Sequence, residues 1–573
     1  MRCRTAVYSV LIVALMVPAY VTAVSNRVAH MNSPDAFDVL IVGGRIMDGS
    51  GNTSYHADIG IRNKRIIKIG RLGMATAKQK INADGQVIAP GFIDLMGQSD
   101  WLLLVDSRAA SHLTQGITLE VSGEGESVAP TNSRLLREQE PFFAKYGIKP
   151  NWTMLEDFFR ELEKHPPAIN FATFVGAGTL RKLVIGDDNR PATPGQLKQM
   201  EDLAAAAMEQ GAFGISTALM YAPGRFASTE ELIALAKVVA RYNGVYVTHQ
   251  RSEGDGIDSS LDEIFRIARE ANIPAHIFHL KTMYRQNFGK MPVVIRRIEA
   301  ARREGLDITA DVYPYVAASA SLDALLPLWA RDGGREPMLQ RLRDPVQRAR
   351  IKKDLKVSTT EWENEYYGAG GAAGFVITDV TNPGMKSLVG RRLSEIAQEQ
   401  KKDPVDVIMD LILEDAAPPE FVSFIMEESD VRLALQQSWA AFCTDSPIRA
   451  LDGPLFEGSP HPRAYGAFTR VLGHYVREEH LLTLEDAIRK ATSLPAQLLG
   501  LQDRGLIREG LYADLVIFDP EKVIDRSTFE RPHQYSAGIS YVLVNGEIVV
   551  DHGQISSARP GMVLKGSGSI AKH

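Results

Sequence analysis

Short apolar segments that end in small or polar residues recur through the middle of the chain, with helical stretches between them. Thr193 and Ser228 each precede residues that begin a helix, with Pro194 and Gln196 completing the first of these signals. Alternating strands and helices predict a parallel sheet, and eight such units predict an α/β fold with a closed TIM-type (β/α)8 barrel. The predicted barrel strands are 87–95, 117–121, 169–175, 212–216, 245–247, 275–278, 308–310 and 439–442.

Both ends of the chain instead contain short strand-like segments bounded by glycine and asparagine. Segments 37–42 and 57–61 lie near the start, and segments 513–518 and 539–544 lie near the end. Asn545-Gly546 predicts a hairpin turn, because both residues tolerate a positive φ. We therefore expect short antiparallel strands at both ends, which together form one small β domain.

This pattern predicts how the chain is divided into domains. The small β domain would comprise residues 37–88 and, with a C-terminal tail, residues 501–573. The barrel would extend over residues 89–500. Residues 316–437, between the seventh and eighth strands, form a long and partly helical insertion that could cover the barrel mouth.

The first residues have the features of a secretory signal peptide. Arg2 and Arg4 precede an apolar stretch at 7–17, and the small residues 21–23 follow Pro18. We expect cleavage near residue 23, a linker at 24–36, and an exported protein, either periplasmic or secreted. The alternative is an uncleaved membrane anchor. No other segment is long and apolar enough to cross a bilayer, so we expect no stable membrane insertion after cleavage.

Composition narrows the functional classes. The 573 residues are 45% hydrophobic and 23% charged, which is typical of a globular protein with a large core. The net charge is −6 and no long basic run occurs, so nothing indicates a nucleic-acid partner. Of the two cysteines, only Cys443 would remain after signal cleavage. An intrachain disulfide is then impossible, and we expect Cys443 to be a buried apolar residue.

Polar residues follow several predicted strands at the edge where barrel enzymes carry their active sites. His249 follows the fifth strand, His279 the sixth, and Asp445 the eighth, while Glu124 and Glu126 follow the second. Each has a structural interpretation, such as a hydrogen-bonded histidine at a strand end or a turn-capping aspartate. Their coincidence at one rim favours a divalent metal site, because imidazole and carboxylate are zinc ligands.

Several motifs resemble the amidohydrolase superfamily and, within it, the D-aminoacylase (N-acyl-D-amino-acid deacylase) branch. The segment QVIAPGFID at 86–94 resembles the superfamily's opening segment. The similarity covers nearly everything from about residue 37 to residue 560. The motifs that resemble the branch lie at 211–217, 221–224, 248–254, 279–281, 310–315, 461–466 and 510–516.

The resemblance implies a metal-dependent hydrolase. Zinc would be held by Glu124, His249 and His279, at the tight site of the branch, and would activate water and polarise a carbonyl group. Asp445 would be the general base. The reaction would be hydrolysis of the amide bond of N-acyl-amino acids, of the D series in this branch.

The resemblance also implies how a small acyl-amino-acid or dipeptide substrate is bound. Arg463 would bind the substrate carboxylate, where a planar guanidinium suits two oxygens. Lys281 and Tyr313 would orient the substrate. The rival interpretations are another amidohydrolase reaction on the same scaffold, such as dipeptide or lactam hydrolysis, and a catalytically inactive binding protein.

The chain departs from the family pattern in its metal ligands. The superfamily places His-x-His after the first strand, whereas this chain has Met96 and Gln98. The branch uses a cysteine ligand after the second strand, and alignment puts Glu124 there, with Glu126 as the alternative. Met and Gln are poor substitutes for imidazole, so we expect one zinc ion instead of two.

Overall fold

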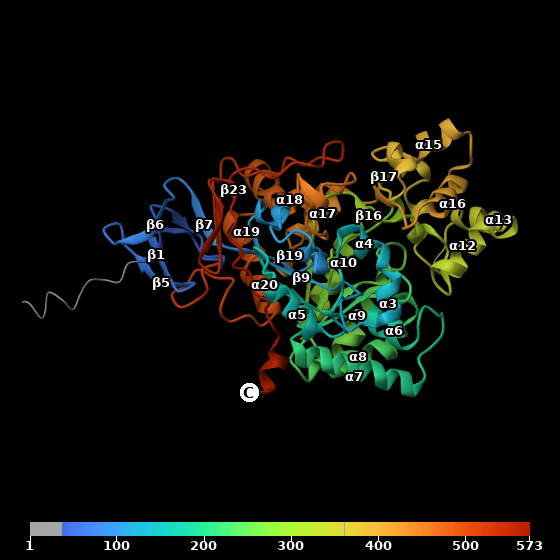
Figure 1. Ribbon diagram of the computed structural model, residues 1–573, viewed down its shortest axis with the longest axis horizontal. Helices are drawn as coiled ribbons and strands as arrows, with labels where there is room; N and C mark the ends of the chain where they lie inside the picture. The colour runs from blue at the N-terminus through green and yellow to red at the C-terminus, as the bar shows by residue number, and fades with distance from the viewer. Residues whose placement is uncertain (1–36, 360, 573) are drawn as a thin grey trace, which may run out of the picture.

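The computed structural model describes residues 37–359 and 361–572 (Figure 1). The predicted signal peptide at 1–23 and linker at 24–36 lie outside the described residues. No helix within the described residues is long and apolar enough to cross a membrane.

Eight strand positions form the barrel, and each coincides with a predicted strand. Two parallel sheets, β10-β9-β8 and β11-β12-β13-β14-β15-β19, meet at Phe174, the single residue between β10 and β11. On the other side, a parallel bridge between Gly97 and Ser446 closes the barrel just beyond β8 and β19. The predicted TIM-type barrel is therefore confirmed. Its strands are β8 (Phe92–Asp94), β9 (Ile117–Ser122), β10 (Asn170–Thr173) with β11 (Val175–Gly176), β12 (Gly214–Ala218), β13 (Val245–His249), β14 (Ala275–Ile277), β15 (Ile308–Val312) and β19 (Ala440–Phe442).

Helices follow the strands, and the predicted start signals operate as expected. At the start of α7 (Pro194–Gln210), Thr193 Oγ1 accepts from the Gln196 backbone, while the Gln196 side chain accepts from the Thr193 N–H. At the start of α8 (Thr229–Ala240), Ser228 Oγ accepts from the Glu231 N–H. Other helices that follow barrel strands are α6 (Ala177–Val184), α9 (Ile257–Ala271), α10 (Met291–Arg303) and α19 (Leu484–Ala491).

The predicted first strand is wrong in one respect, because the apolar run 87–95 belongs to two sheets. Its first part, β7 (Val87–Pro90), lies between two strands of the terminal β domain, whereas β8 pairs with β9 in the barrel. The chain passes from one sheet to the other at Gly91, where an added Cβ would lie 2.1 Å from Thr118 Oγ1. Glycine permits this close approach of the two segments.

Strands from both chain ends form the terminal β domain, where early blue and late red segments lie side by side in Figure 1. Its two sheets enclose a separate cluster of isoleucine, valine and leucine side chains. Asn545 and Gly546, at φ +48° and +78°, form the predicted hairpin turn. The strands are not all antiparallel as predicted, because β1–β6 and β2–β7 pair in parallel. One sheet contains β5 (Arg65–Gly70), β4 (Asp58–Arg62), β1 (Phe37–Val42) and β6 (Ala77–Asn82); the other contains β23 (Gln554–Ile555), β22 (Glu547–Asp551), β21 (Ile539–Val544), β20 (Leu515–Phe518), β7, β2 (Arg45–Ile46) and β3 (Tyr55–His56).

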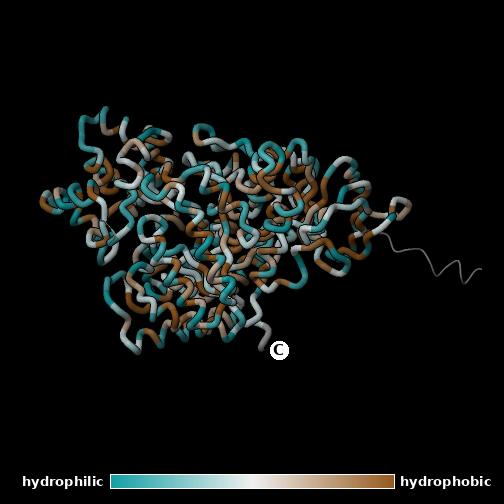
Figure 2. The backbone as a smooth tube through the Cα atoms, turned by 180° about the vertical axis from the view of Figure 1, so that it is seen from behind, coloured by the Kyte–Doolittle hydropathy of each residue, from teal (hydrophilic) through white to brown (hydrophobic). Residues whose placement is uncertain are grey.

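The insertion between β15 and β19 forms a lobe at the opposite end of the molecule from the terminal β domain (Figure 1). It combines a three-stranded antiparallel sheet with helices, in agreement with its partly helical sequence. Along the described backbone, hydrophobic and hydrophilic segments alternate, as Figure 2 shows from behind. The insertion contains β16 (Ala318–Ser321), β17 (Phe375–Asp379) and β18 (Glu420–Ser423), with α12 (Arg335–Arg343), α13 (Pro345–Leu355), α14 (Glu365–Gly368), α15 (Leu393–Gln400) and α16 (Pro404–Glu414).

Candidate metal centre and substrate cavity

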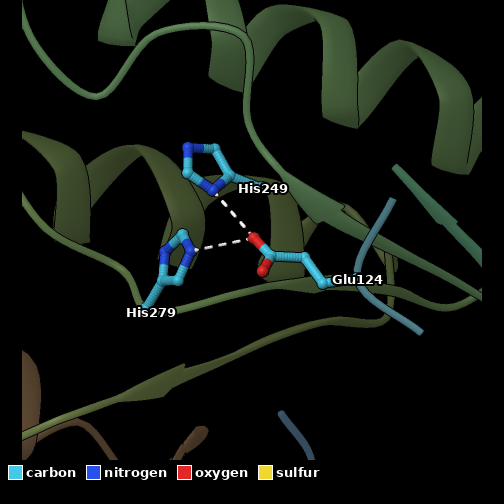
Figure 3. A group of neighbouring side chains, drawn as sticks. All are labelled: Glu124, His249 and His279. Carbon is cyan, nitrogen blue, oxygen red and sulfur yellow. Dashed lines mark hydrogen bonds and ion pairs between the residues drawn. The ribbon is translucent and has the colours of Figure 1, made fainter. Parts of the chain in front are cut away.

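Glu124, His249 and His279 converge at the carboxyl ends of three barrel strands (Figure 3). One carboxylate oxygen, Glu124 Oε1, lies 2.9 Å from His249 Nδ1 and 3.4 Å from His279 Nε2. One potential ligand atom from each residue lies within 4.8 Å of the other two. Among the described residues, these three alone form such a group.

The spacing of these atoms fits a zinc ion. Ligands at about 2.0–2.1 Å in a tetrahedral site lie about 3.4 Å apart. The two distances from Glu124 Oε1, 2.9 and 3.4 Å, are therefore close to what a shared ion requires. Two imidazoles and one carboxylate also match the ligand set of catalytic zinc sites, which leave the fourth position open.

The structure places the two candidate glutamates differently. Glu124 is part of the histidine group, whereas Glu126 forms an ion pair with Lys182 at 2.9 Å and has about half of its side chain exposed. Gly125 between them has a φ of +63°, a backbone conformation that few residues other than glycine adopt. The geometry therefore favours Glu124 as the metal-binding carboxylate.

The electrostatics of the group favour a bound cation. Burial raises the pKa of Glu124, but hydrogen bonds from His249 and His279 outweigh it and hold the pKa well below its usual range. Burial and Lys281 lower the pKa of His279, but Glu253 and other nearby carboxylates outweigh them and raise it to about 10. The carboxylates around His279 thus favour positive charge at this position, which a bound divalent cation would also supply.

Sequence reasoning missed Glu253, which lies behind both histidines. Glu253 Oε1 is 3.1 Å from His279 Nδ1, and Glu253 Oε2 is 3.7 Å from His249 Nε2. Carboxylates in this position orient histidine ligands and set which ring nitrogen carries the proton. Glu253 is buried, with 1% of its side chain exposed, and a buried carboxylate would have indicated a functional role. The sequence of a loop at a strand end does not reveal which of its side chains are buried.

Lys281 supports Glu253. Its ammonium group donates to both oxygens of Glu253 at 2.8 Å and lies 2.7 Å from His279 Nδ1. This ion pair, together with the histidines, outweighs the effect of burial and holds the pKa of Glu253 well below its usual range. Lys281 lines the cavity as expected for a substrate-orienting residue, but in this structure its charge is already paired.

Asp445 and Arg463 form a buried ion pair in the site. Arg463 Nη1 lies 2.6 Å from Asp445 Oδ2, and the guanidinium stacks over Tyr313 with Cζ 4.6 Å from the ring centroid. Burial raises the pKa of Asp445, against the opposing effect of Arg463. Within the described residues, Arg463 Nε has no hydrogen-bond partner. The structure therefore brings the predicted base and the predicted carboxylate-binding residue into direct contact.

One cavity of about 350 Å³ lies at the barrel mouth, and it is lined by Glu124, His249, Glu253, His279, Lys281, Tyr313, Asp445 and Arg463. Residues 318–321 of β16, Glu365 of α14 and Glu420 of β18 form part of its wall. The insertion thus contributes to the wall of the cavity. Burial raises the pKa of Glu365 to about 7. The volume suits a small molecule.

Met96 and Gln98 occupy the segment where the superfamily carries His-x-His. Met96 is buried, with 1% of its surface exposed. Gln98 reaches the cavity, where its Nε2 lies 2.9 Å from Glu124 Oε2 and 3.0 Å from Asp445 Oδ1. Neither side chain supplies an imidazole.

Sequence comparison identifies relatives over most of the chain. A family model described as "Amidohydrolase family" matches residues 381–550. The D-aminoacylase of Alcaligenes xylosoxydans xylosoxydans is 36% identical over 532 residues, which cover 92% of this chain and 97% of that enzyme.

Solved structures agree with the sequence comparison. The N-acyl-D-glutamate deacylase of Bordetella bronchiseptica, complexed with zinc and a phosphonate mimic of the tetrahedral intermediate, has a TM-score of 0.78. It is 32% identical, and the match covers 93% of this chain and all of that one. A D-aminoacylase with a binuclear metal centre, described by one-metal activation and second-metal attenuation, has a TM-score of 0.75. It is 35% identical, with coverage of 92% of this chain and all of that one.

Proposed function

Since this chain belongs to the D-aminoacylase branch of the amidohydrolase family, we propose that it hydrolyses the amide bond of N-acyl-D-amino acids with one zinc ion. The observation that carries this proposal is the convergence of Glu124, His249 and His279 on a cavity that also contains Asp445 and Arg463. This arrangement combines a metal site, a base and a group for an anionic substrate.

Zinc held by Glu124, His249 and His279 would polarise the substrate carbonyl and lower the pKa of a water molecule. Glu253 orients the His279 imidazole from behind, at 3.1 Å, and its other oxygen lies 3.7 Å from His249 Nε2. Asp445 accepts a proton from the attacking water and returns it to the leaving amine. Its position just after β19, in the cavity that the metal group also lines, suits this transfer.

Arg463 binds the α-carboxylate of the substrate. Its guanidinium is buried, lies against the Tyr313 ring and has an Nε without a hydrogen-bond partner among the described residues. A carboxylate that enters the cavity would pair with this guanidinium group, which lines the cavity. The amide bond would then lie between Arg463 and the metal group, within reach of Asp445.

The number of ions follows from the segment after β8. A second zinc ion would need ligands beyond the three-residue group, and Met96 and Gln98 provide no imidazole. The relative with a binuclear centre is described by one-metal activation. This description supports the proposal of a single ion.

The test is an activity screen with a metal assay. The purified, zinc-loaded enzyme should release free amino acid from N-acetyl-D-amino acids faster than from N-acetyl-L-amino acids, dipeptides or lactams. Asp445→Asn, prepared identically, is the matched control and should be nearly inactive with its zinc retained. Faster turnover of dipeptides or lactams would replace the proposed substrate, and binding without turnover of any amide would contradict an enzymatic function.

A further inference from the structure

Gln98 connects the metal group to the base with a single amide. Its Nε2 is 2.9 Å from Glu124 Oε2 and 3.0 Å from Asp445 Oδ1. A primary amide has two N–H donors, so each carboxylate can receive one. The two carboxylates thus have a shared neutral donor between them.

The oxygens that Gln98 contacts are the ones that other partners leave free. Glu124 Oε1 faces His249 and His279, and Asp445 Oδ2 faces Arg463. With both oxygens of each carboxylate held, the rotation of both carboxylates is set. Gln98 is therefore placed to fix the orientation of the base relative to the metal group.

The backbone on both sides of Gln98 is also held. Glu120 accepts from the backbone N–H and the hydroxyl of Ser99, and Asp94 accepts from the Met96 N–H. Asp94 also accepts from the N–H and hydroxyl of Thr444, the residue before Asp445. One buried carboxylate thus connects the two segments, which the Gly97–Ser446 bridge joins as well. The distance between Gln98 and Asp445 is therefore fixed by backbone contacts.

We propose that Gln98 is a positioning residue that takes the place of a second cation, bridging Glu124 and Asp445 and excluding another metal ion. This inference rests on the proposed zinc-dependent function. A cation between two carboxylates would reduce their repulsion and fix their geometry, and the amide does both without a formal charge. The neighbouring Met96 is buried and offers only a thioether, a poor substitute for imidazole at a zinc site.

The kinetic test replaces Gln98 by a side chain of similar length without N–H donors. Gln98→Met should lower kcat by about 10-fold to 100-fold, as loss of a group that orients a ligand does, with KM changed by less than about 3-fold. Its zinc content should stay at one equivalent. Gln286→Met is the matched control, because the Gln286 amide also donates to a carboxylate, Asp255, but at an exposed position. That variant should keep the wild-type kcat.

The metal test restores the missing imidazoles. Met96→His combined with Gln98→His should raise the zinc content from one to two equivalents per chain after dialysis. If this double variant does not fold, Gln98→Glu, which has the same size and adds a carboxylate, is loaded and counted in the same way and should also hold two. Metal content does not depend on the substrate, so this test stands even if the proposed amide hydrolysis fails. A Gln98→Met enzyme with unchanged kcat, or a folded histidine or glutamate variant with one equivalent, would overturn the proposal.

Discussion

The protein contains two groups in which carboxylate and imidazole side chains contact each other. Only one of these groups lines the cavity. The open group is Glu124, His249 and His279, which line the cavity wall. The sealed group is Asp94, Glu120 and His112, each with no exposed surface. Its histidine Nε2 lies 3.4 Å from Glu120 Oε2 and 3.6 Å from Asp94 Oδ2. The same residue types therefore occur in both environments.

The two groups differ in what their carboxylates accept. In the sealed group, the hydrogen bonds that Asp94 and Glu120 accept from the described residues come from backbone N–H groups and from the hydroxyls of Ser99, Ser122 and Thr444. The nearby His112 Nε2 has no hydrogen-bond partner among the described residues. In the open group, Glu124 Oε1 faces two imidazole nitrogens. A site for chemistry thus requires convergent ligand atoms and access to a cavity, whereas buried acids alone can serve to hold loops in place.

The largest expected effect concerns Asp445, which lines the same cavity as the open group. Asp445→Asn keeps the size of the side chain but removes the base, so kcat should fall by about 10²-fold to 10⁴-fold. Steady-state kinetics on the best N-acyl-D-amino acid measure it, with zinc content as the control for an intact site. A variant with full zinc and a near-normal kcat would show that another group carries the proton.

The second expected effect concerns metal retention. Glu124→Ala should reduce bound zinc from one equivalent to a small fraction after dialysis, because the remaining two imidazoles bind far more weakly. Glu126→Ala, at the partly exposed neighbour, is the matched control and should keep the metal. Loss of zinc in the control and retention in Glu124→Ala would transfer the ligand role to Glu126.

The third expected effect concerns substrate binding. Arg463→Ala should raise KM by about 10-fold to 100-fold for substrates with a free α-carboxylate, since a charge-assisted pair contributes about 1.5–3 kcal/mol. For the corresponding α-amides the increase should be much smaller. Measuring both substrates separates recognition from a general disturbance of Asp445, which lies 2.6 Å away. Equal increases for both substrates would contradict carboxylate binding.

The fourth prediction concerns stability and tests the sealed group. Burial raises the pKa of Asp94 from 3.8 to about 6, so the folded state binds this proton more tightly than the unfolded chain. The resulting contribution to stability is present below about pH 4 and is lost as the pH rises through 6, an effect of roughly 3 kcal/mol. Asp94→Asn should remove this part of the pH dependence.

Urea unfolding between pH 4 and pH 7 measures the free energy of unfolding of Asp94→Asn and of the wild type. The exposed substitution Asp188→Asn is the control and should leave the wild-type curve unchanged. Metal content should be normal in both variants, in contrast to Glu124→Ala. If the free energy of unfolding depends on pH in the same way for Asp94→Asn and the wild type, the pKa of Asp94 does not differ between the folded and unfolded states.

The smallest effect is expected outside both groups. We propose that the protein is exported and that residues 1–23 are removed, because Arg2 and Arg4 precede an apolar stretch and small residues. Protein sequencing of the exported form should find a new N-terminus near residue 24, and activity should not differ from that of a chain started there. An exported protein that still begins at Met1 would contradict cleavage.

Local patterns in the sequence predicted much of the fold. The eight barrel strands, the capping residues Thr193 and Ser228 and the Asn545-Gly546 turn each depend on a few consecutive residues, whose conformational preferences are readable in order. His249 and His279 were recognisable because strand ends in a barrel point to one rim and because their motifs resemble a known family.

Only the tertiary structure decided contacts between distant residues. The change of sheet at Gly91 depends on its packing against Thr118. Glu253 lies behind His279, and Gln98 lies between Glu124 and an aspartate 347 positions away. Such contacts depend on strand register, on loop conformation and on the closing of the barrel, which no short segment encodes. The sequence by itself determined which residue types stand at the strand ends, and the closed barrel decided which of them face the metal group.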